Sequence, residues 1–302
     1  MKILVIGGSY FFGRWFVEFA AKDHDVTVLN RGNIPVVVQG DKNKVTNLVC
    51  DRRDVEALEK LPDTDYDAVV DFCAYNPGDI EIIASKFRRP GQKYIYISTV
   101  DIYEKTGERV YVDSPFADLS FYKNMPPENV PPEIGYILGK QELERELIRV
   151  AEKYSLTPVS VRPAILYGPA NYAPREKMFF DWINEAGQVI LPSDSDGFFQ
   201  FIHVADAAKG VLKITELGAD KVSKAYNFCN EKPENYDSFA KALHEAAGRD
   251  FEEIRLSVSD IINRGIPLPY PLTKAESAIF DTSEFKSLGV ETKAFDLKSR
   301  RG

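Results

Sequence analysis

The stretch VIGGSYFFGRW, residues Val5–Trp15, decides the expected fold of this chain. The apolar run Lys2–Gly7 leads into it and is typical of a buried strand, and Gly13 opens a helical pattern. Gly7 and Gly8 allow a sharp backbone turn, and the free N–H groups and positive dipole end at the start of a helix attract an anion. The stretch therefore predicts a strand, a phosphate-binding loop and a helix, in that order.

Aromatic residues occupy the middle of this loop, where a dinucleotide-binding loop usually carries a further glycine. Tyr10 stands at that glycine position. We expect it to be tolerated on condition that its backbone φ stays negative and its ring turns outward. The candidate cofactor-binding residues of the loop are then Gly7, Gly8, Ser9, Tyr10, Phe11, Phe12 and Gly13. A plain strand, turn and helix packed by aromatic residues is the alternative interpretation.

The composition indicates a soluble globular protein. The chain has 302 residues, of which 44% are hydrophobic and 28% charged, and no segment approaches the roughly 18 unbroken apolar residues of a membrane span. The length suits a large α/β domain with a smaller lobe. A formal net charge of −8 repels polyanions, so a nucleic-acid partner is disfavoured and no membrane partner is expected.

The cysteines and histidines do not indicate a disulfide framework or a metal site. Cys50, Cys73 and Cys229 are odd in number, widely spaced and without a Cys-x-x-Cys pair. The three histidines, His24, His203 and His244, lack metal-ligand spacing, so we interpret them as structural. Unpaired cysteines fit a reducing compartment, and we expect a cytoplasmic location.

Apolar runs alternate with amphipathic stretches through the first half of the chain. Strands are expected at Lys2–Gly7, Asp25–Asn30, Val45–Cys50, Asp67–Cys73, Lys93–Thr99 and Thr157–Pro163, and helices at Gly13–Lys22, Asp54–Lys60, Pro77–Phe87 and Pro132–Tyr154. This alternation is typical of a parallel sheet whose two faces are both covered by helices. We therefore predict an α/β fold with a doubly wound parallel sheet of the Rossmann type.

The second half of the chain has a looser pattern. Residues Glu104–Pro132 hold several prolines and no clear period, which predicts an irregular surface excursion placed to shape a substrate entrance. After Pro163 the elements become short and mixed. We expect a dinucleotide-binding domain over residues 1–165 and a smaller α/β substrate lobe over residues 166–302, partly interleaved with the first.

The ends of the second and third strands carry candidate adenosine-binding residues. Asn30 and Arg31 stand about 20 residues after the glycine loop, where a carboxylate usually accepts hydrogen bonds from the ribose of NAD. Because an arginine fork suits phosphate oxygens, we expect NADP to be preferred over NAD. The segment Asn30–Asn33, Asn-Arg-Gly-Asn, also has the residue types that favour a turn, so a solvated turn is the alternative. Asp51 is expected to accept from the adenine amino group, or else it or Asp54 caps the next helix.

Tyr136 and Lys140 lie four residues apart on one face of a predicted helix. An adjacent ammonium favours a phenolate and lowers the pKa of a tyrosine from about 10, which would make Tyr136 a general acid or base. Thr99 ends the fifth strand, at the sheet edge where ligands of such folds collect, and its hydroxyl is suited to orient a substrate oxygen. Surface packing of the pair, and a strand-end turn at Thr99, are the alternatives.

Together these motifs resemble the extended branch of the short-chain dehydrogenase/reductase superfamily, which is known for NAD-dependent epimerases and dehydratases. Further agreements are VRPAILYGP (Val161–Pro169), FIHVADAA (Phe201–Ala208) and AYNFCNEKP (Ala225–Pro233). The loop GGSYFFG and the turn VLNRG are similar to a subgroup, written GGTRFIG and NRG, that includes chloroplast stem-loop-binding proteins and reductases. A residue other than glycine at position 10 is therefore familiar in that subgroup.

The resemblance implies roles for particular residues. Thr99, Tyr136 and Lys140 fall on the catalytic positions of the family. The cofactor-contacting positions fall on Gly7, Gly13, Asn30, Arg31, Asp51, Cys73, Ala74, Tyr136, Lys140 and Pro163. Two polar residues of nucleotide-sugar enzymes are missing: Phe198, Phe199 and Gln200 stand where a diphosphate-binding Arg is usual, and Ile165 stands where an Asn is usual. A substrate less polar than a nucleotide sugar follows from these departures.

The sequence leaves two functions open. The first is an NAD(P)-dependent epimerase, dehydratase or reductase that transfers hydride to or from a carbinol or keto carbon of a sugar-like or other small substrate, with Tyr136 moving the proton. The second is a non-catalytic dinucleotide-binding regulatory or RNA-binding protein on the same fold. The resemblance also implies a homodimer, formed through the helices Pro77–Phe87 and Pro132–Tyr154.

Overall fold

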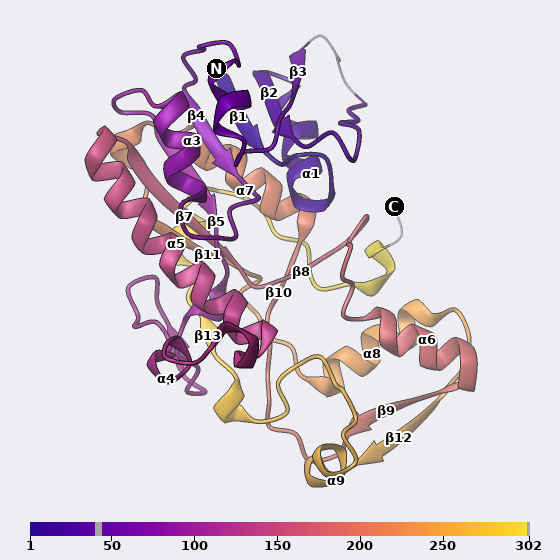
Figure 1. Cartoon of the computed structure of the whole chain (residues 1–302). Coiled ribbons are helices and arrows are strands. Elements are labelled where there is room, and N and C mark those ends of the chain that lie inside the picture. Colours follow the sequence, from indigo (N-terminus) through magenta and orange to yellow (C-terminus); the bar gives the residue numbers. More distant parts are fainter. Residues whose placement is uncertain (40–43, 301–302) are drawn as a thin grey trace.

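A seven-stranded parallel sheet forms the centre of the molecule (Figure 1). The computed structural model describes residues 1–39 and 44–300. The strand order is β11-β7-β5-β4-β1-β2-β3, which confirms the predicted doubly wound Rossmann-type fold. The strands are β1 (Lys2–Ile6), β2 (Asp25–Asn30), β3 (Val45–Val49), β4 (Ala68–Asp71), β5 (Lys93–Ile97), β7 (Thr157–Pro163) and β11 (Ala225–Phe228).

The order of the strands creates a crevice beside β1. This strand pairs with β2 on one side, where Val5 lies opposite Val28, and with β4 on the other, where Val5 lies opposite Val70. The chain builds outward from β1 first through β2 and β3 and then, in the other direction, through β4 and β5. Loops that leave β1 and β4 at their carboxyl ends therefore diverge, and ligands of such sheets bind in the gap between them.

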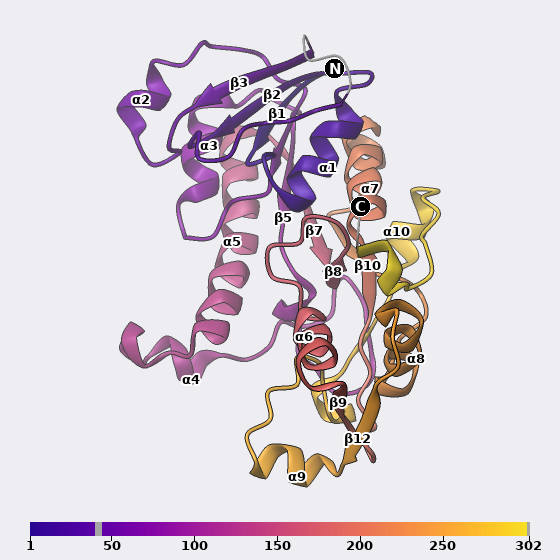
Figure 2. The same ribbon diagram turned by 90° about the vertical axis from the view of Figure 1, so that its right-hand side faces the viewer.

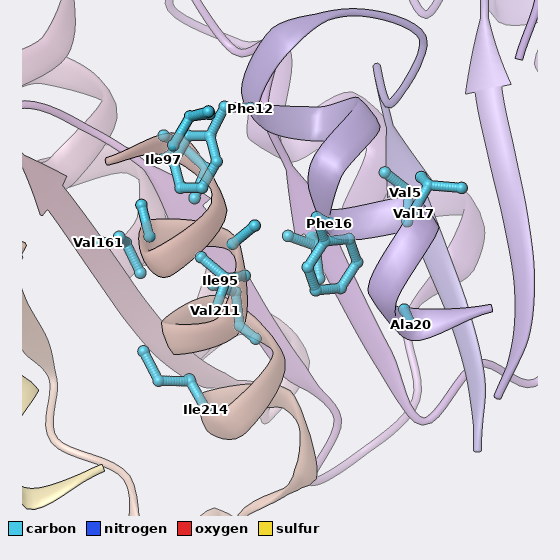
Figure 3. Packing of buried hydrophobic residues seen from close by; sticks show 14 of the residues in the cluster. Val5, Phe12, Phe16, Val17, Ala20, Ile95, Ile97, Val161, Val211 and Ile214 are labelled. Atoms are coloured by element: carbon cyan, nitrogen blue, oxygen red, sulfur yellow. The ribbon is translucent and has the colours of Figure 1, made fainter. Parts of the chain in front are cut away.

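Helices cover both faces of the sheet (Figures 1 and 2). On one face α1 (Phe11–Ala20) packs beside α7 (Val204–Glu216), and on the other α3 (Asp79–Phe87) packs beside α5 (Pro132–Tyr154). Figure 3 shows the first of these layers, in which Phe16 of α1 and Val211 of α7 pack against sheet residues such as Ile95. The short α2 (Val55–Glu59) follows β3. Near-continuous apolar strands are therefore buried on both faces, as their composition predicts.

Residues after position 165 contribute both to the central sheet and to a smaller lobe. Helix α7 and strand β11 belong to the layers of the central sheet. Helix α10 (Ser283–Ser287) also packs on this sheet through Phe285, whereas most of the other elements form a smaller lobe whose core holds aromatic side chains such as Phe179, Phe201 and Tyr270. The lobe comprises α6 (Lys177–Ala186), β9 (Gln188–Pro192), α8 (Tyr236–Ala247), β12 (Glu252–Leu256) and α9 (Val258–Asn263), and β8 (Ile165–Tyr167) pairs with β10 (Phe201–His203) near its start. The division into domains at residues 165 and 166 stays a prediction.

The excursion between β5 and α5 has more regular structure than its sequence indicates. It contains β6 (Arg109–Val110), α4 (Ser120–Lys123) and the 3-10 turns η2 (Val100–Ile102) and η3 (Pro127–Asn129), and β6 pairs with β13 (Ile279–Phe280) near the C-terminus, before α10 (Ser283–Ser287). The amide of Gln141 donates to Ala117 O at 2.9 Å and ties the excursion to α5. Within the described residues, no helix combines the length and the apolar character that a bilayer crossing requires.

Candidate functional site

A cleft of about 730 Å³ opens at the carboxyl ends of β1, β2, β3, β4, β5 and β7. It brings together nearly all the residues that the sequence indicated for cofactor and catalysis. The lining includes Gly7, Gly8, Ser9, Tyr10, Phe11, Phe12, Gly13, Asn30, Arg31, Asp51, Cys73, Thr99, Tyr136, Lys140 and Pro163. Ala74 does not line the cleft, because it is fully buried, and it acts through its backbone carbonyl.

The three glycines of the loop each occupy a position that a larger residue would disrupt. Gly7 has φ +99° and Gly8 has φ +83°, a region that side chains with a Cβ rarely adopt. A Cβ on Gly7 would lie 2.6 Å from the Sγ of Cys73, and one on Gly13 would lie 2.7 Å from the backbone N of Gly8. The loop therefore brings β1, the start of α1 and the end of β4 into close contact, and it leaves the first turn of α1 facing the cleft.

The aromatic residues of the loop do not close the cleft. Tyr10 has φ −142° and is 43% exposed, so both conditions placed on it are met. Phe12 turns the other way and packs on Phe72 at 5.1 Å between ring centroids. Tyr172, from the loop after β8, lies with its ring centroid 6.1 Å from that of Tyr10 and 5.9 Å from that of Phe11. The aromatic residues thus connect the loop to neighbouring elements.

The amide of Asn30 organises the loops at the adenosine end of the cleft. Its Nδ2 donates to Ser9 Oγ at 2.8 Å and to Asn47 Oδ1 at 3.1 Å, and its Oδ1 accepts from the N of Gly32 at 2.7 Å. The turn interpretation and the cofactor interpretation of Asn30 are therefore compatible, because one side chain shapes the turn while it lines the cleft. Arg31 is exposed at the rim.

Two aspartates that follow β3 divide the roles that the sequence left open. Asp54 caps α2, because its carboxylate accepts from the N of Ala57 at 3.0 Å. Asp51 lines the cleft, and its Oδ1 accepts from the N of Arg53 at 2.9 Å. The capping alternative thus applies to Asp54, and Asp51 stays a candidate for contact with adenine.

Lys140 is held in the wall of the cleft with only 3% of its surface exposed. Its Nζ donates to Ala74 O at 3.1 Å and to Ile97 O at 2.9 Å, and it lies 4.8 Å from the centroid of the Tyr75 ring. Burial lowers the pKa of this ammonium to about 8, although the nearby carboxylate of Asp71 acts in the opposite direction. Two of its three donors are used by carbonyls, which leaves one for a ligand.

Tyr136 does not have the lowered pKa that its spacing from Lys140 predicts. Tyr136 is 44% exposed, but partial desolvation in the cleft, and next the carboxylate of Asp101, raise its pKa above the ordinary value, while a hydrogen bond with Thr99 acts against them. The expected lowering is wrong for the free protein. The reason is that the ammonium lies 5.7 Å from the centroid of the Tyr136 ring and donates to backbone carbonyls instead.

Asp101 is a cleft residue that sequence reasoning missed. Thr99 Oγ1 donates to Asp101 Oδ2 at 3.2 Å and accepts from the N of Asp101 at 3.1 Å, so Thr99 caps η2 while it lines the cleft. Burial raises the pKa of Asp101, but Lys105 at 2.9 Å and Arg175 outweigh that effect and lower it overall. The sequence feature that indicates Asp101 is its position two residues after Thr99, because both residues then lie at the same edge of the sheet.

The burial of two other cleft residues, Arg52 and Asp79, is not indicated by the sequence. Arg52 follows Asp51 in the sequence and is only 8% exposed, and it pairs with Asp71 at 2.7 Å. Asp79, at the start of α3, is 2% exposed and pairs with Arg53 at 3.2 Å. Charged residues after a strand are usually interpreted as solvated, and nothing local in the sequence indicates that these are buried.

Cys73 and the departures from nucleotide-sugar enzymes have clear structural settings. Burial, with a smaller effect from Asp71, raises the pKa of the Cys73 thiol to about 11, so it stays protonated near neutral pH. Gln200 donates to Asn230 O at 2.7 Å and accepts from the N of Phe280 at 2.7 Å. Phe199 and Gln200 therefore belong to the interior of the smaller lobe, whereas Ile165 lines the cleft.

The fold and cleft define a Rossmann-type α/β protein with a loop suited to a dinucleotide. A family model for the NAD dependent epimerase/dehydratase family matches residues 3–229, and the chain belongs to this family.

Two curated proteins show sequence similarity. The chain is 28% identical over 266 residues to the chloroplast stem-loop binding protein of 41 kDa b of Arabidopsis thaliana, a match that covers 84% of this chain and 65% of that protein. The chain thus spans slightly less than two thirds of that relative. It is also 34% identical over 85 residues to UDP-glucose 4-epimerase of Vibrio cholerae, covering 27% of this chain and 23% of that enzyme.

Solved structures share the fold over the whole chain. UDP-glucuronic acid 4-epimerase of Bacillus cereus, in complex with NAD, superposes with a TM-score of 0.71 at 16% identity and covers 99% of this chain and 95% of its own. dTDP-glucose 4,6-dehydratase of Bacillus anthracis, in complex with NAD, gives a TM-score of 0.68 at 15% identity, with 99% and 94% covered. At these identities the similarity establishes the fold.

Proposed function

We propose that the cleft binds NADP in preference to NAD, and that the enzyme transfers hydride between the nicotinamide and a carbinol or keto carbon of a small substrate, with Tyr136 moving the proton. The observation that carries the proposal is the convergence of the glycine loop, Thr99, Tyr136 and Lys140 on one cleft. These residues come from separate elements of the chain, so chance surface packing does not account for their convergence.

The residues present suit a dinucleotide. Close approach of backbone at Gly7, Gly8 and Gly13 leaves a cradle that a Cβ would fill, and the first turn of α1 faces it. Lys140 keeps one donor for the ribose beside the nicotinamide. When bound, the cofactor supplies or accepts the hydride.

The protonation state of the cleft favours Tyr136 as a proton donor. Its raised pKa keeps the phenol protonated near neutral pH, so its hydroxyl is ready to protonate a carbonyl oxygen as that oxygen gains charge. Thr99 lies beside it and is suited to orient the same oxygen. Reduction of a ketone uses this protonated form of Tyr136, and the reverse reaction uses the phenolate.

The proposed substrate is small and sugar-like or less polar. The named ligands of solved relatives include UDP-glucuronic acid and UDP-glucose, which carry a diphosphate. In this chain Gln200 has both ends of its amide engaged in the smaller lobe, and Ile165 contributes an apolar wall to the cleft. The lining of the cleft ends at Arg175, before the elements of the smaller lobe. These features favour a substrate without a nucleotide.

A non-catalytic dinucleotide-binding or RNA-binding protein is the second candidate. The name of the Arabidopsis thaliana relative, a stem-loop binding protein, favours it. The net charge of −8 and the presence of Thr99, Tyr136 and Lys140 in one cleft favour the enzyme. The homodimer and the cytoplasmic location stay predictions.

Calorimetric titration of cofactor-stripped protein with NADP and NAD, each oxidised and reduced, tests the proposal. We expect micromolar binding of NADP and weaker binding of NAD. Arg31→Ala should weaken NADP binding about tenfold or more and leave NAD binding unchanged, so NAD is the internal control. Preference for NAD would contradict the role of Arg31, and binding of neither cofactor would favour the RNA-binding form of the second candidate.

A further inference from the structure

Asp71, at the end of β4, is a fully buried carboxylate that no part of the proposed reaction uses. Its Oδ1 accepts from Arg52 Nη2 at 2.7 Å and from the backbone N of Cys73 at 3.0 Å, and its Oδ2 accepts from the hydroxyl of Tyr94 at 2.7 Å. Burying a charge in this way is costly unless the charge is paired, and Arg52 supplies the pairing.

The same arginine reaches a second carboxylate. Arg52 Nη1 lies 3.8 Å from Asp79 Oδ2, at ion-pair distance, and makes no hydrogen bond of its own within the described residues. Asp79 Oδ2 accepts from the backbone N of Tyr75 at 2.9 Å and of Asn76 at 3.0 Å. Arg52 thus bridges two carboxylates, which between them hold the backbone N–H groups of residues 73, 75 and 76.

The loop between these carboxylates carries a contact to the cleft. Residues 72–78 leave the end of β4 and enter α3, and Ala74 in the middle of this loop directs its carbonyl to Lys140 Nζ at 3.1 Å. At its far end Gly78 N donates to Glu146 of α5 at 2.6 Å. The loop is therefore held at both ends, with the contact to Lys140 in the middle.

We propose that Arg52 is a positioning residue for Lys140: by bridging Asp71 and Asp79 it holds residues 72–78 so that the carbonyl of Ala74 receives the ammonium. The consequence for catalysis rests on the function proposed above, whereas the positioning of Lys140 does not. Arg52 follows Asp51, the candidate contact for adenine, in the sequence. The proposal therefore links this part of the cleft to the part that holds Lys140.

The charges around Lys140 make the proposal testable by sign. After burial, which lowers the pKa of Lys140, the carboxylate of Asp71 is the largest charge effect and raises it, while Arg52 lowers it. The groups that face the ammonium are Asp71, Cys73, Glu144 and Arg52, together with the rings of Tyr75, Tyr96 and Tyr136. Loss of the Arg52 charge alone would raise the midpoint of Lys140, whereas loss of the Ala74 carbonyl contact, which stabilises the ammonium, would lower it.

Competitive labelling of the cofactor-free protein with acetic anhydride, read by mass spectrometry from about pH 6 to about pH 11, measures the titration midpoint of Lys140. We expect Arg52→Gln to lower the midpoint by about one pH unit, because the released loop withdraws the carbonyl of Ala74, and Asp71→Asn to lower it by about one. Arg52→Lys, which keeps the charge beside Asp71, should restore the wild-type value. Because no cofactor is present, a failure of NADP binding leaves this result intact.

Lys93→Met serves as the matched control. Lys93 is a buried cation, 5% exposed, whose Nζ donates to Ile214 O at 3.3 Å in α7, on the opposite face of the sheet. Its loss should lower the melting temperature without moving the midpoint of Lys140. The proposal is overturned if Arg52→Gln raises the midpoint or leaves it in place, or if Lys93→Met lowers it as far as Arg52→Gln does. If Arg52→Gln does not fold, two other variants test the proposal. Asp71→Asn should lower the midpoint of Lys140, and Arg52→Lys should leave it unchanged.

Discussion

Single residues of the cleft behave according to their surroundings rather than their sequence spacing. Tyr136 and Lys140 stand one helical turn apart, yet the ammonium donates to the carbonyls of Ala74 and Ile97 and leaves the phenol protonated. Asp101, two residues after Thr99, contributes further to this state. In the free protein Tyr136 is therefore a protonated phenol, which is the form that the proposed proton donation requires.

Tyr136→Phe tests that role. Because the substitution removes only the hydroxyl, we expect turnover to fall by about 10²- to 10⁴-fold while NADP affinity changes little. Single-turnover oxidation of NADPH measures the first quantity, and calorimetric titration measures the second. The matched variant Tyr111→Phe removes a hydroxyl from an exposed ring outside the cleft and should retain turnover. Equal activity of the wild type and Tyr136→Phe would rule out the proton role.

At the scale of elements, the ends of helices and strands are tied together by buried side chains from distant parts of the chain. Glu146 of α5 is 4% exposed, and its carboxylate accepts from the N of Gly78, Ile80 and Glu81 at 2.6, 3.0 and 2.8 Å. It therefore caps α3, whose own N-cap residue is a glycine without a side chain. Helix α5 thus orients Lys140 and also anchors the helix beside it.

Glu146→Ala should lower the free energy of unfolding by about 3 kcal/mol, because it leaves backbone donors at the start of α3 without a partner. Urea denaturation measures the loss. Glu142→Ala is the matched control on the same helix: its carboxylate is 38% exposed and pairs with Arg145 at 3.4 Å, so its loss should cost less than about 1 kcal/mol. Similar losses for both variants would contradict the capping role.

For the whole molecule, the burial of one ammonium should appear in the dependence of stability on pH. Burial lowers the pKa of Lys140 from 10.5 to about 8. Because the folded value lies below the unfolded value, the unfolded chain binds more protons between these two pH values. The burial of the charged lysine therefore costs stability below about pH 8, and this cost disappears as the pH rises towards 10.5.

Lys140→Met lacks this titration and keeps all the tyrosines, so the difference between the two proteins isolates the effect. We expect the free energy of unfolding of the wild type to rise relative to that of Lys140→Met by on the order of 2 kcal/mol between about pH 8 and about pH 10. Denaturant melts across this range measure the difference. A constant difference between the two proteins would show that Lys140 does not titrate there.

The layered architecture and most of the cleft residues follow from local patterns in the sequence. Short apolar runs and amphipathic stretches specify strands and helices locally, and β2 (Asp25–Asn30), β7 (Thr157–Pro163) and α5 (Pro132–Tyr154) have the bounds that their patterns predict. The residues at strand ends then share one edge of the sheet by topology alone. For this reason the strand pattern was sufficient to assign Asn30, Asp51 and Thr99 to a common site.

The protonation of the cleft residues, and the contacts that hold them in place, depend on how the chain packs in three dimensions. The contacts that set them join residues far apart in the chain, as in the pairing of Arg52 with Asp71 and the bonds from Lys140 to the carbonyls of Ala74 and Ile97. Burial is a property of the assembled layers, so no local pattern indicates that Asp71 is fully buried or that the pKa of Tyr136 is raised. The positions of the reacting groups follow from local periodicity and strand order, whereas their protonation follows from the packing around them.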